Sequence, residues 1–292
     1  MNIVEIRPIG YCYGVINAIN LAKQIRKENP RSPIYVFGMI VHNEAVAKEL
    51  GELGIVTIDT TGLDKRKKLN EFRPGDIVIF TAHGHDESLD SILDNKGITH
   101  YDAVCKIVKM NMGKIRDATN AGRDVIFIGK EGHPETEASI SISPKVHLYD
   151  INKGIDYSKV GANPLVTNQT TLSFPEIEDI HKDIKEHRPN AEIIDEICSA
   201  SRLRQQSIAN LKDEYDLCLI VGSKKSSNTN KLYEIALGKK NIRQTLKIND
   251  KYDLKDINLS NIENVVIASG TSTNVQVVED IKEYLEENAN DK

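Results

Sequence analysis

The sequence has no apolar run of the roughly 18 residues that a membrane-spanning helix needs. Its first apolar stretch is interrupted by Glu5, Arg7 and Pro8, and the small-residue cleavage site of a secretory signal does not follow. The net charge of −5 gives the chain no general attraction to nucleic acid or to anionic lipid. These absences predict a cytoplasmic protein that binds neither a membrane nor nucleic acid.

Cysteine is also scarce, and its placement is regular. In a cytoplasmic chain, four cysteines indicate metal or catalytic roles rather than a disulfide framework. Cys12, Cys105 and Cys198 are separated by two gaps of equal length. Zinc sites usually contain a short Cys-x-x-Cys pair, which is absent, whereas three thiolates are one short of the four that usually hold a cubane iron–sulfur cluster. Cys218 lies in an apolar run and is expected in the core.

Short apolar runs that end in polar or glycine-rich turns alternate with amphipathic helical stretches, which is typical of βα units and a parallel sheet. The clearest runs cover residues 34–38, 76–80, 125–129, 164–166, 217–222 and 265–268. Two polar loops follow each of the three regular cysteines at matched distances. We therefore predict an α/β fold of three similar small parallel-sheet domains, at residues 1–100, 101–194 and 195–292. The polar C-terminal tail, from about Tyr284, is expected to fray.

Polar residues follow the apolar runs, where the carboxyl ends of parallel strands bind ligands. His42, His83 and His133 hold equivalent places at predicted strand ends, which favours a functional role over three core histidines. Glu135 can act as an acid near neutrality if a closed pocket raises its pKa, or it can simply favour a helix start. Thr170 and Thr171 either line the same pocket or cap a helix.

A further group of hydroxyl and amide side chains stands where helices are expected to begin. Ser226, Ser227, Asn228 and Ser272, together with free backbone N–H groups, suit an anion such as phosphate. Residues 222–227 lack the spacing of a P-loop, and Gly270-Thr-Ser272 lacks the second glycine of a hydrolase elbow. Because no acidic pair is placed to hold Mg²⁺, we expect neutral donors and histidine to hold the anion.

Taken together, these motifs resemble those of the 4-hydroxy-3-methylbut-2-enyl diphosphate reductase family, the LytB-type iron–sulfur reductases of the methylerythritol phosphate pathway. The resemblance runs nearly from end to end, and ten motifs in order carry it. They are Gly10-Tyr-Cys-Tyr-Gly-Val15, Val41-His-Asn43, Ala82-His-Gly84, Asp102-Ala-Val-Cys105, Gly132-His-Pro-Glu135, Gln169-Thr-Thr-Leu-Ser173, Glu196-Ile-Cys198, Val221-Gly-Ser223, Ser226-Ser-Asn228 and Ser269–Thr273.

The resemblance implies a cloverleaf of three domains around a [4Fe–4S] cluster that has one open iron and is held by Cys12, Cys105 and Cys198. It implies reductive removal of the substrate hydroxyl as water, giving isopentenyl and dimethylallyl diphosphate, with electrons from an external donor such as ferredoxin or flavodoxin. Glu135 would deliver protons, with Thr170 and His133 helping to orient and relay them. The diphosphate would be bound by His42, His83, His133, Ser226, Asn228 and Ser272, and Thr170 and Ser227 would also contact the substrate.

Four residues depart from the pattern usual in that family. Val104 replaces a Thr before the second cysteine and Lys106 a Pro after it, while Lys225 replaces an Asn and Asn274 a Pro. These departures spare the proposed ligands and acid, but they could mark a paralogue with an altered substrate. Two alternative functions also stay open. One is a cluster-dependent dehydratase of another phosphorylated alcohol, which would need no external electrons. The other is a non-catalytic iron–sulfur sensor, which would have no use for Glu135 or the anion-binding loops.

Overall fold

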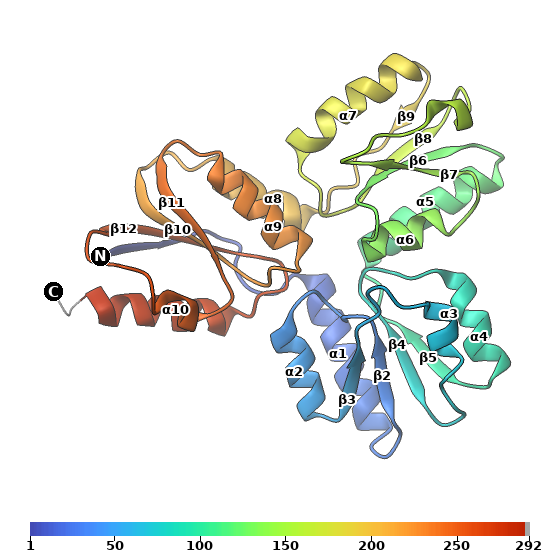
Figure 1. Cartoon of the computed structure of the whole chain (residues 1–292), viewed down its shortest axis with the longest axis horizontal. Coiled ribbons are helices and arrows are strands. Elements are labelled where there is room, and N and C mark those ends of the chain that lie inside the picture. The colour runs from blue at the N-terminus through green and yellow to red at the C-terminus, as the bar shows by residue number, and fades with distance from the viewer. Residues whose placement is uncertain (290–292) are drawn as a thin grey trace. The chain divides into compact units, whose positions relative to one another are not determined.

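The computed structural model describes residues 1–289, which form three four-stranded parallel sheets (Figure 1). The first sheet has the order β3-β2-β4-β5 and contains β2 (Ile34–Phe37), β3 (Ile55–Ile58), β4 (Ile77–Phe80) and β5 (Thr99–Asp102). The second has the order β7-β6-β8-β9 and contains β6 (Val125–Gly129), β7 (Val146–Asp150), β8 (Leu165–Asn168) and β9 (Glu192–Ile193). The third has the order β1-β12-β10-β11 and contains β1 (Asn2–Glu5), β10 (Tyr215–Val221), β11 (Ile242–Ile248) and β12 (Asn264–Ser269).

The three sheets share one strand order. In each, the strand that comes first along the module lies between the second and the third, and a fourth strand pairs with the third. That fourth strand leads directly to a cysteine: β5 to Cys105, β9 to Cys198 and β1 to Cys12. This repetition confirms the prediction of three similar parallel-sheet α/β modules.

The first strand of the chain is placed differently from the expected division into domains. β1 pairs in parallel with β12, so residues 2–5 belong to the sheet of the C-terminal third rather than to the first sheet. The expected limit near residue 100 likewise falls inside β5. The limits at residues 100 and 194 otherwise stay predictions.

Helices follow the strands at equivalent places in each module. Those that begin directly after a regular cysteine are α1 (Tyr13–Glu28), α5 (Lys106–Asn120) and α8 (Ser199–Ala209). Those that follow the first strand of a module are α2 (Glu44–Glu52), α6 (Pro134–Ile140) and α9 (Ser227–Leu237). The others are α3 (Lys65–Leu69), α4 (Asp90–Asn95), α7 (Phe174–His187) and α10 (Val275–Ala289), with short 3-10 turns η1 (Glu87–Leu89), η2 (Tyr157–Lys159) and η3 (Lys251–Leu254).

The chain folds into two compact units. The terminal unit comprises residues 1–13, 42–44 and 198 onward, and contains the third sheet. The middle unit comprises residues 14–41 and 45–197, and contains the first and second sheets. Within residues 1–289, no helix is long and apolar enough to cross a membrane.

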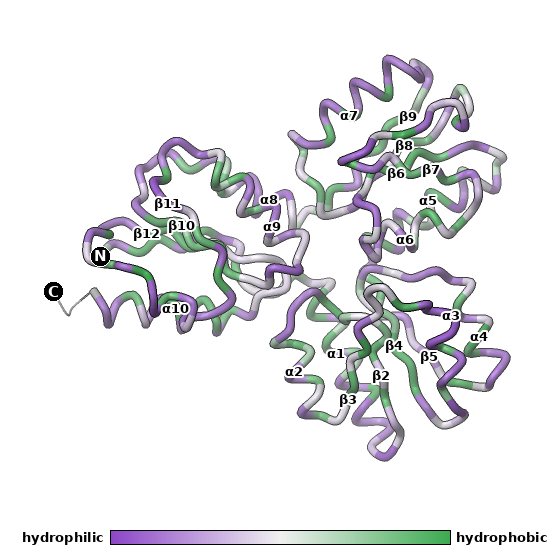
Figure 2. The backbone as a smooth tube through the Cα atoms, viewed as in Figure 1, coloured by the Kyte–Doolittle hydropathy of each residue, from purple (hydrophilic) through white to green (hydrophobic). Residues whose placement is uncertain are grey.

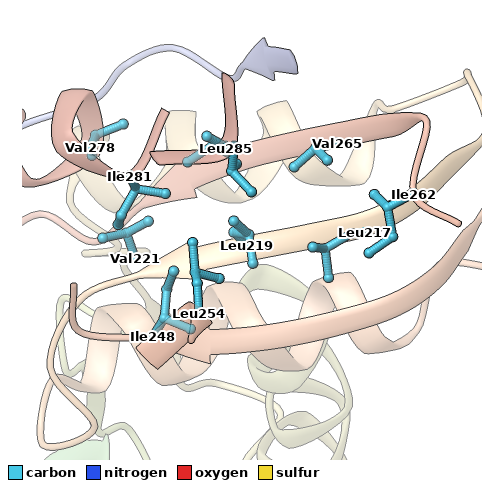
Figure 3. Packing of buried hydrophobic residues seen from close by; sticks show 11 residues of the cluster. Leu217, Leu219, Val221, Ile248, Leu254, Ile262, Val265, Val278, Ile281 and Leu285 are labelled. Atoms are coloured by element: carbon cyan, nitrogen blue, oxygen red, sulfur yellow. The ribbon is translucent and has the colours of Figure 1, made fainter. Parts of the chain in front are cut away.

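Buried apolar residues hold each sheet between helices, and hydrophobic residues gather along the strands (Figure 2). In the third sheet, Leu217, Leu219 and Val221 of β10 face residues of α10 (Figure 3). The alternate residues Cys218 and Ile220 belong to the cluster on the other face, which includes residues of α8 and α9. Strands buried on both faces are expected to read as continuous apolar runs, as these do.

The polar tail expected from Tyr284 is instead largely helical. Val278, Ile281 and Leu285 recur at helical spacing on α10 and are fully buried against the third sheet (Figure 3). Burying each such side chain contributes about 1.5–3 kcal/mol, which outweighs the polarity of the outer face. Residues 284–289 therefore belong to α10, and the expected fraying of the chain end stays a prediction; residues 290–292 lie outside the described part of the chain.

Candidate functional site

The three regular cysteines occupy equivalent backbone positions. Cys105 is the N-cap of α5 with φ −60° and ψ 137°, and Cys198 is the N-cap of α8 with φ −64° and ψ 140°. Cys12 directly precedes α1. The backbone N–H of Cys105 donates to Ala82 O and that of Cys12 to Thr271 O, both at 2.9 Å. Both acceptors lie two residues after the third strand of a sheet, so the same hydrogen bond positions two of the cysteines.

The chemistry of these three thiols fits an iron–sulfur cluster. All three are half-buried, and each lies at the start of a helix, where the helix dipole favours negative charge. Thiolates are the usual ligands of such clusters. Within residues 1–289, no three His, Cys, Asp or Glu side chains come together as ligands of a single metal ion.

Cys218 has a different environment. It is fully buried in β10, and burial raises the pKa of its thiol to about 12. The thiol therefore stays protonated and unreactive near neutrality. The prediction that Cys218 is a core residue is confirmed.

Glu135 and Thr170 form a buried pair in the middle unit. Glu135 lies in the first turn of α6, where His133 is the N-cap and its Nδ1 accepts a hydrogen bond from Glu135 N at 3.2 Å. Thr170, just after β8, donates to Glu135 twice. Its backbone N–H lies 2.8 Å from Oε1, and its Oγ1 lies 2.9 Å from Oε2. The alternative that Thr170 and Thr171 cap a helix is wrong, because Ser173 is the N-cap of α7.

The environment of Glu135 tunes its acidity. The residue is 1% exposed, and burial raises its pKa to about 7, although the two hydrogen bonds from Thr170 act in the opposite direction. Desolvation dominates because it penalises the charged carboxylate. A carboxyl group with this pKa can hold or release a proton near neutral pH.

His83 and His133 meet in the same unit. Their ring centroids are 5.9 Å apart in an edge-to-face arrangement, and both side chains are half-buried. The next residue, Gly84, packs closely on two helices, because a Cβ there would lie 3.1 Å from Met112 Sδ on α5 and 3.3 Å from Ala138 Cβ on α6. The loop after β4 therefore lies against α5 and α6.

The predicted anion-binding residues of the terminal unit form a hydrogen-bonded group. Ser272 Oγ donates to His42 O at 3.2 Å, and Asn43 Nδ2 donates to Ser272 O at 2.5 Å. Asn228 Oδ1 accepts from the N–H of Thr271 at 2.9 Å. The pKa of His42 is lowered mainly by burial, so its imidazole favours the neutral form.

The start of α9 contributes the remaining members of this group. Ser226 is its N-cap, with Oγ accepting from Thr229 N at 3.2 Å, and Ser227 is its first residue. Asn228 Nδ2 donates to Ser201 Oγ at 3.1 Å, and Ser201 Oγ lies 3.8 Å from Cys198 Sγ. A short polar chain therefore joins the third cysteine to the predicted phosphate-binding loops.

Each unit thus brings together part of the predicted set. Cys105, Glu135 and Thr170 lie in the middle unit with His83 and His133. The terminal unit holds the others, namely Cys12, His42, Cys198, Ser226, Ser227, Asn228 and Ser272. The assignment of ligands, acid and substrate contacts to these residues stays a prediction.

Two residues of the terminal unit belong to this group without having been predicted from the sequence. Asn43, part of the Val41-His-Asn43 motif, binds the Ser272 carbonyl. Arg204, which lies outside every motif, is buried close to Cys12 and Cys198. The available signal was the helical spacing of Ser201, Arg204 and Ile208, which places polar residues on the inner face of α8.

Comparisons with known proteins give a consistent assignment. The chain is 37% identical to the 4-hydroxy-3-methylbut-2-enyl diphosphate reductase of Bacillus pumilus, over 98% of this chain and 91% of that protein. It is 34% identical to the reductase of the same name from Symbiobacterium thermophilum, over 98% of this chain and 97% of that protein.

The fold agrees with solved structures. The E-1-hydroxy-2-methyl-but-2-enyl-4-diphosphate reductase of Plasmodium falciparum matches with a TM-score of 0.85 and 28% identity, over 97% of this chain and 87% of that one. A second structure, of the terminal enzyme of the non-mevalonate pathway, matches with a TM-score of 0.70 and 27% identity, over 98% of this chain and all of that one.

These relatives are named as diphosphate reductases, one of them as the terminal enzyme of the non-mevalonate pathway, which confirms the prediction of an oxidoreductase. The family model described as LytB protein matches residues 3–286. The chain belongs to the LytB protein family.

Proposed function

We propose that the chain reduces 4-hydroxy-3-methylbut-2-enyl diphosphate to isopentenyl and dimethylallyl diphosphate. The substrate takes up two electrons and two protons, its allylic C–O bond breaks, and the hydroxyl group leaves as water. The names of the full-length relatives support this substrate. The observation that carries the proposal is the buried Glu135 carboxyl group, which can release a proton near neutral pH.

In this proposal, Cys12, Cys105 and Cys198 hold a [4Fe–4S] cluster. When bound, the cluster supplies electrons and an open iron that acts as a Lewis acid on the substrate oxygen. The equivalent positions of the three thiols at helix starts support the ligand assignment. An external donor such as ferredoxin or flavodoxin would replace the electrons used in each turnover.

Glu135 is the proposed proton donor. A carboxyl group with a pKa of about 7 is protonated often enough to donate from Oε to the departing hydroxyl oxygen. The two hydrogen bonds from Thr170 hold the carboxyl group in one orientation and stabilise the carboxylate left behind. His133, whose Nδ1 contacts the backbone N–H of Glu135, would help to orient and relay the proton.

The diphosphate would be bound mainly by neutral donors. Ser226, Ser227 and Asn228 stand at the N-terminus of α9, where unpaired N–H groups favour a phosphate. Ser272, His42, His83, His133 and Thr170 complete the proposed set. Binding energy from the diphosphate would then hold the reacting carbon in place for proton transfer.

An anaerobic assay tests the proposal. Protein reconstituted with iron and sulfide is mixed with dithionite, a viologen mediator and the substrate, and reductant oxidation is followed with product analysis. We expect substrate-dependent oxidation that yields both five-carbon diphosphates. Loss of the hydroxyl group without reductant oxidation would instead identify a dehydratase, and a bound cluster without turnover would reject this substrate.

A further inference from the structure

Arg204 is a buried cation whose hydrogen bonds all go to main-chain carbonyl groups. The residue lies on α8 and is 5% exposed. Its Nε donates to Ser269 O at 3.1 Å, Nη1 to Ala200 O at 3.1 Å and Nη2 to Gly10 O at 2.6 Å. All of these residues belong to the terminal unit. The guanidinium therefore joins three chain segments that carry or adjoin Cys12 and Cys198.

Among residues 1–289, no Asp or Glu forms an ion pair with Arg204, and the negative charges that act on its guanidinium are those of Cys12 and Cys198. Burial lowers the pKa of the guanidinium, while negative charge on Cys12 and Cys198 raises it. A buried charge is costly unless it is compensated, and here the three main-chain carbonyl groups offset part of that cost.

In the second module, an uncharged residue occupies the position equivalent to that of Arg204. Arg204 lies six residues after Cys198, and Asn111 lies six residues after Cys105. Asn111 Nδ2 donates to the carbonyl of Asn168, the last residue of β8, at 3.0 Å. Arg204 makes the equivalent bond to Ser269, the last residue of β12. The arginine thus makes a contact that the second module also has, and adds both a charge and a bond to Gly10.

The bond to Gly10 completes a set of three hydrogen bonds among Gly10, Arg204 and Ser269, which we call the Gly10 bracket. It holds the segment just before Cys12. Gly10 N donates to Ser269 Oγ at 3.2 Å, while Gly10 O accepts from Arg204, which also binds Ser269 O. Gly10 has φ 83°, a conformation that glycine adopts without strain. Cys12 lies two residues after Gly10 in the chain. Loss of the guanidinium would release one side of this bracket.

We propose that Arg204 is a positioning residue that fixes the Cys12 segment to the Cys198 helix and keeps a permanent positive charge beside these two ligands. The inference rests on the proposed function, because it concerns the cluster that the cysteines would hold. Reduction adds negative charge to a cluster, so a nearby cation raises its reduction potential. The bracket, in turn, slows the departure of the cluster.

Two variants distinguish the effect of the positive charge from the effect of the hydrogen bonds in the Gly10 bracket. Arg204→Gln removes the charge, whereas Arg204→Lys keeps it but replaces three separate donor nitrogens by a single one, which cannot take up the positions of all three. Arg188→Gln is the matched control, since Arg188 also binds main-chain carbonyls, those of Tyr157, Val160 and Gly161, but lies in the middle unit. Reconstituted proteins are compared by redox titration and by the rate of cluster loss to a chelator.

We expect Arg204→Gln to shift the one-electron reduction equilibrium about tenfold toward the oxidised cluster, which corresponds to about 59 mV. Arg204→Lys should keep the wild-type potential but lose its cluster several-fold faster, and Arg188→Gln should match wild type in both. A wild-type potential in Arg204→Gln would overturn the electrostatic role. A wild-type rate of cluster loss in Arg204→Lys would overturn the proposal that the bracket slows the departure of the cluster.

Amide hydrogen exchange in the cluster-free protein gives a readout that does not depend on cluster binding. We expect residues 8–12 to exchange faster in Arg204→Gln than in wild type or Arg188→Gln, and unchanged exchange would contradict the bracket. A wild-type protein that binds no iron would reject the proposed function instead. The two failures are therefore distinguishable.

Discussion

At the scale of single residues, burial raises the pKa of Glu135 while its hydrogen bonds from Thr170 lower it. Replacing Glu135 by Gln keeps the size and the partners of the side chain but removes the transferable proton. We expect Glu135→Gln to keep its cluster and bind substrate, while kcat falls by about 10²–10⁴-fold, the range of general acid catalysis. Turnover in the anaerobic assay and cluster absorbance check this.

Glu137→Gln is the control on the same helix. Glu137 is two residues further along α6, is 43% exposed and pairs with Lys65. We expect near wild-type turnover in Glu137→Gln, because an ion pair at the surface contributes little to stability. Wild-type activity in Glu135→Gln would remove that residue from the mechanism.

The raised pKa of Glu135 also predicts a dependence of stability on pH. Its pKa is 4.5 before burial and about 7 in the folded protein, so the folded state binds the proton more tightly than the unfolded state. Between these values the free energy of unfolding must fall as pH rises. Relative to Glu135→Gln, wild type should lose about 2 kcal/mol between about pH 5 and pH 8.

Urea unfolding of cluster-free wild type and Glu135→Gln at both pH values measures this difference. Comparison with the variant cancels the other titrating groups. A stability difference between the two proteins that stays constant would show that the pKa of Glu135 is not raised in the folded protein, and a change in the opposite direction would show that it is lowered.

Lys225 stands where the family pattern commonly has Asn, and its charge lowers the pKa of His42. Its Nζ lies 3.9 Å from Glu44 Oε1, and both side chains are more than half exposed. Burial is the main cause of the lowered pKa of His42; Glu44 raises this pKa and Lys225 lowers it further. We expect Lys225→Asn to raise the pKa of His42 and Glu44→Gln to lower it.

NMR titration of the His42 ring in both variants tests these directions. The two shifts should shrink at high salt, because the charges are exposed. Shifts of the same sign in both variants would contradict the electrostatic explanation.

At the scale of secondary-structure elements, a glycine at the end of a central strand allows the following helix to pack closely. A Cβ on Gly129 would lie 2.5 Å from Thr136 Oγ1 and 2.9 Å from a ring carbon of Phe127. In the third sheet, a Cβ on Gly222 would lie 2.6 Å from Thr229 Oγ1. Two modules therefore use the same contact to position the helices that carry Glu135 and Asn228.

We expect Gly129→Ala to destabilise the protein by about 1–3 kcal/mol, as overpacking of a close-packed core does. Gly113→Ala is the matched control in the same unit, because an added Cβ on this helical glycine would have no atom within 4 Å. That variant should be neutral or slightly stabilising. Chemical denaturation compares the two, and equal stabilities would show that the strand end can relax.

The elements that could be predicted from the sequence are the inner ones. The six apolar runs overlap β2, β4, β6, β8, β10 and β12, which are the two central strands of each sheet. Central strands are buried on both faces and so are continuously apolar, whereas edge strands such as β5 and β9 are largely exposed and lack that pattern. The pairing of β1 with β12 connects the two ends of the chain, and local periodicity cannot predict such a contact.

At the scale of the whole molecule, the repetition of cysteines and loops predicted the repetition of sheets. Equal spacing is visible in the sequence because each module carries one cysteine and two loops at matched positions. Arg204 could not be predicted this way, because the corresponding residues are Ala18 and Asn111 in the other modules. Its importance comes from bonds to Gly10 and Ser269, which are distant in sequence.

The most direct test of the account is the iron and sulfide content of anaerobically reconstituted cysteine variants. Cys12→Ser, Cys105→Ser and Cys198→Ser are compared with wild type and with Cys218→Ser, whose thiol is buried in the core. We expect wild type and Cys218→Ser to hold iron and sulfide in the equal amounts of a [4Fe–4S] cluster, and each of the other variants to lose most of both. A full cluster in any of those three variants would contradict the claim that the three modules each supply one ligand.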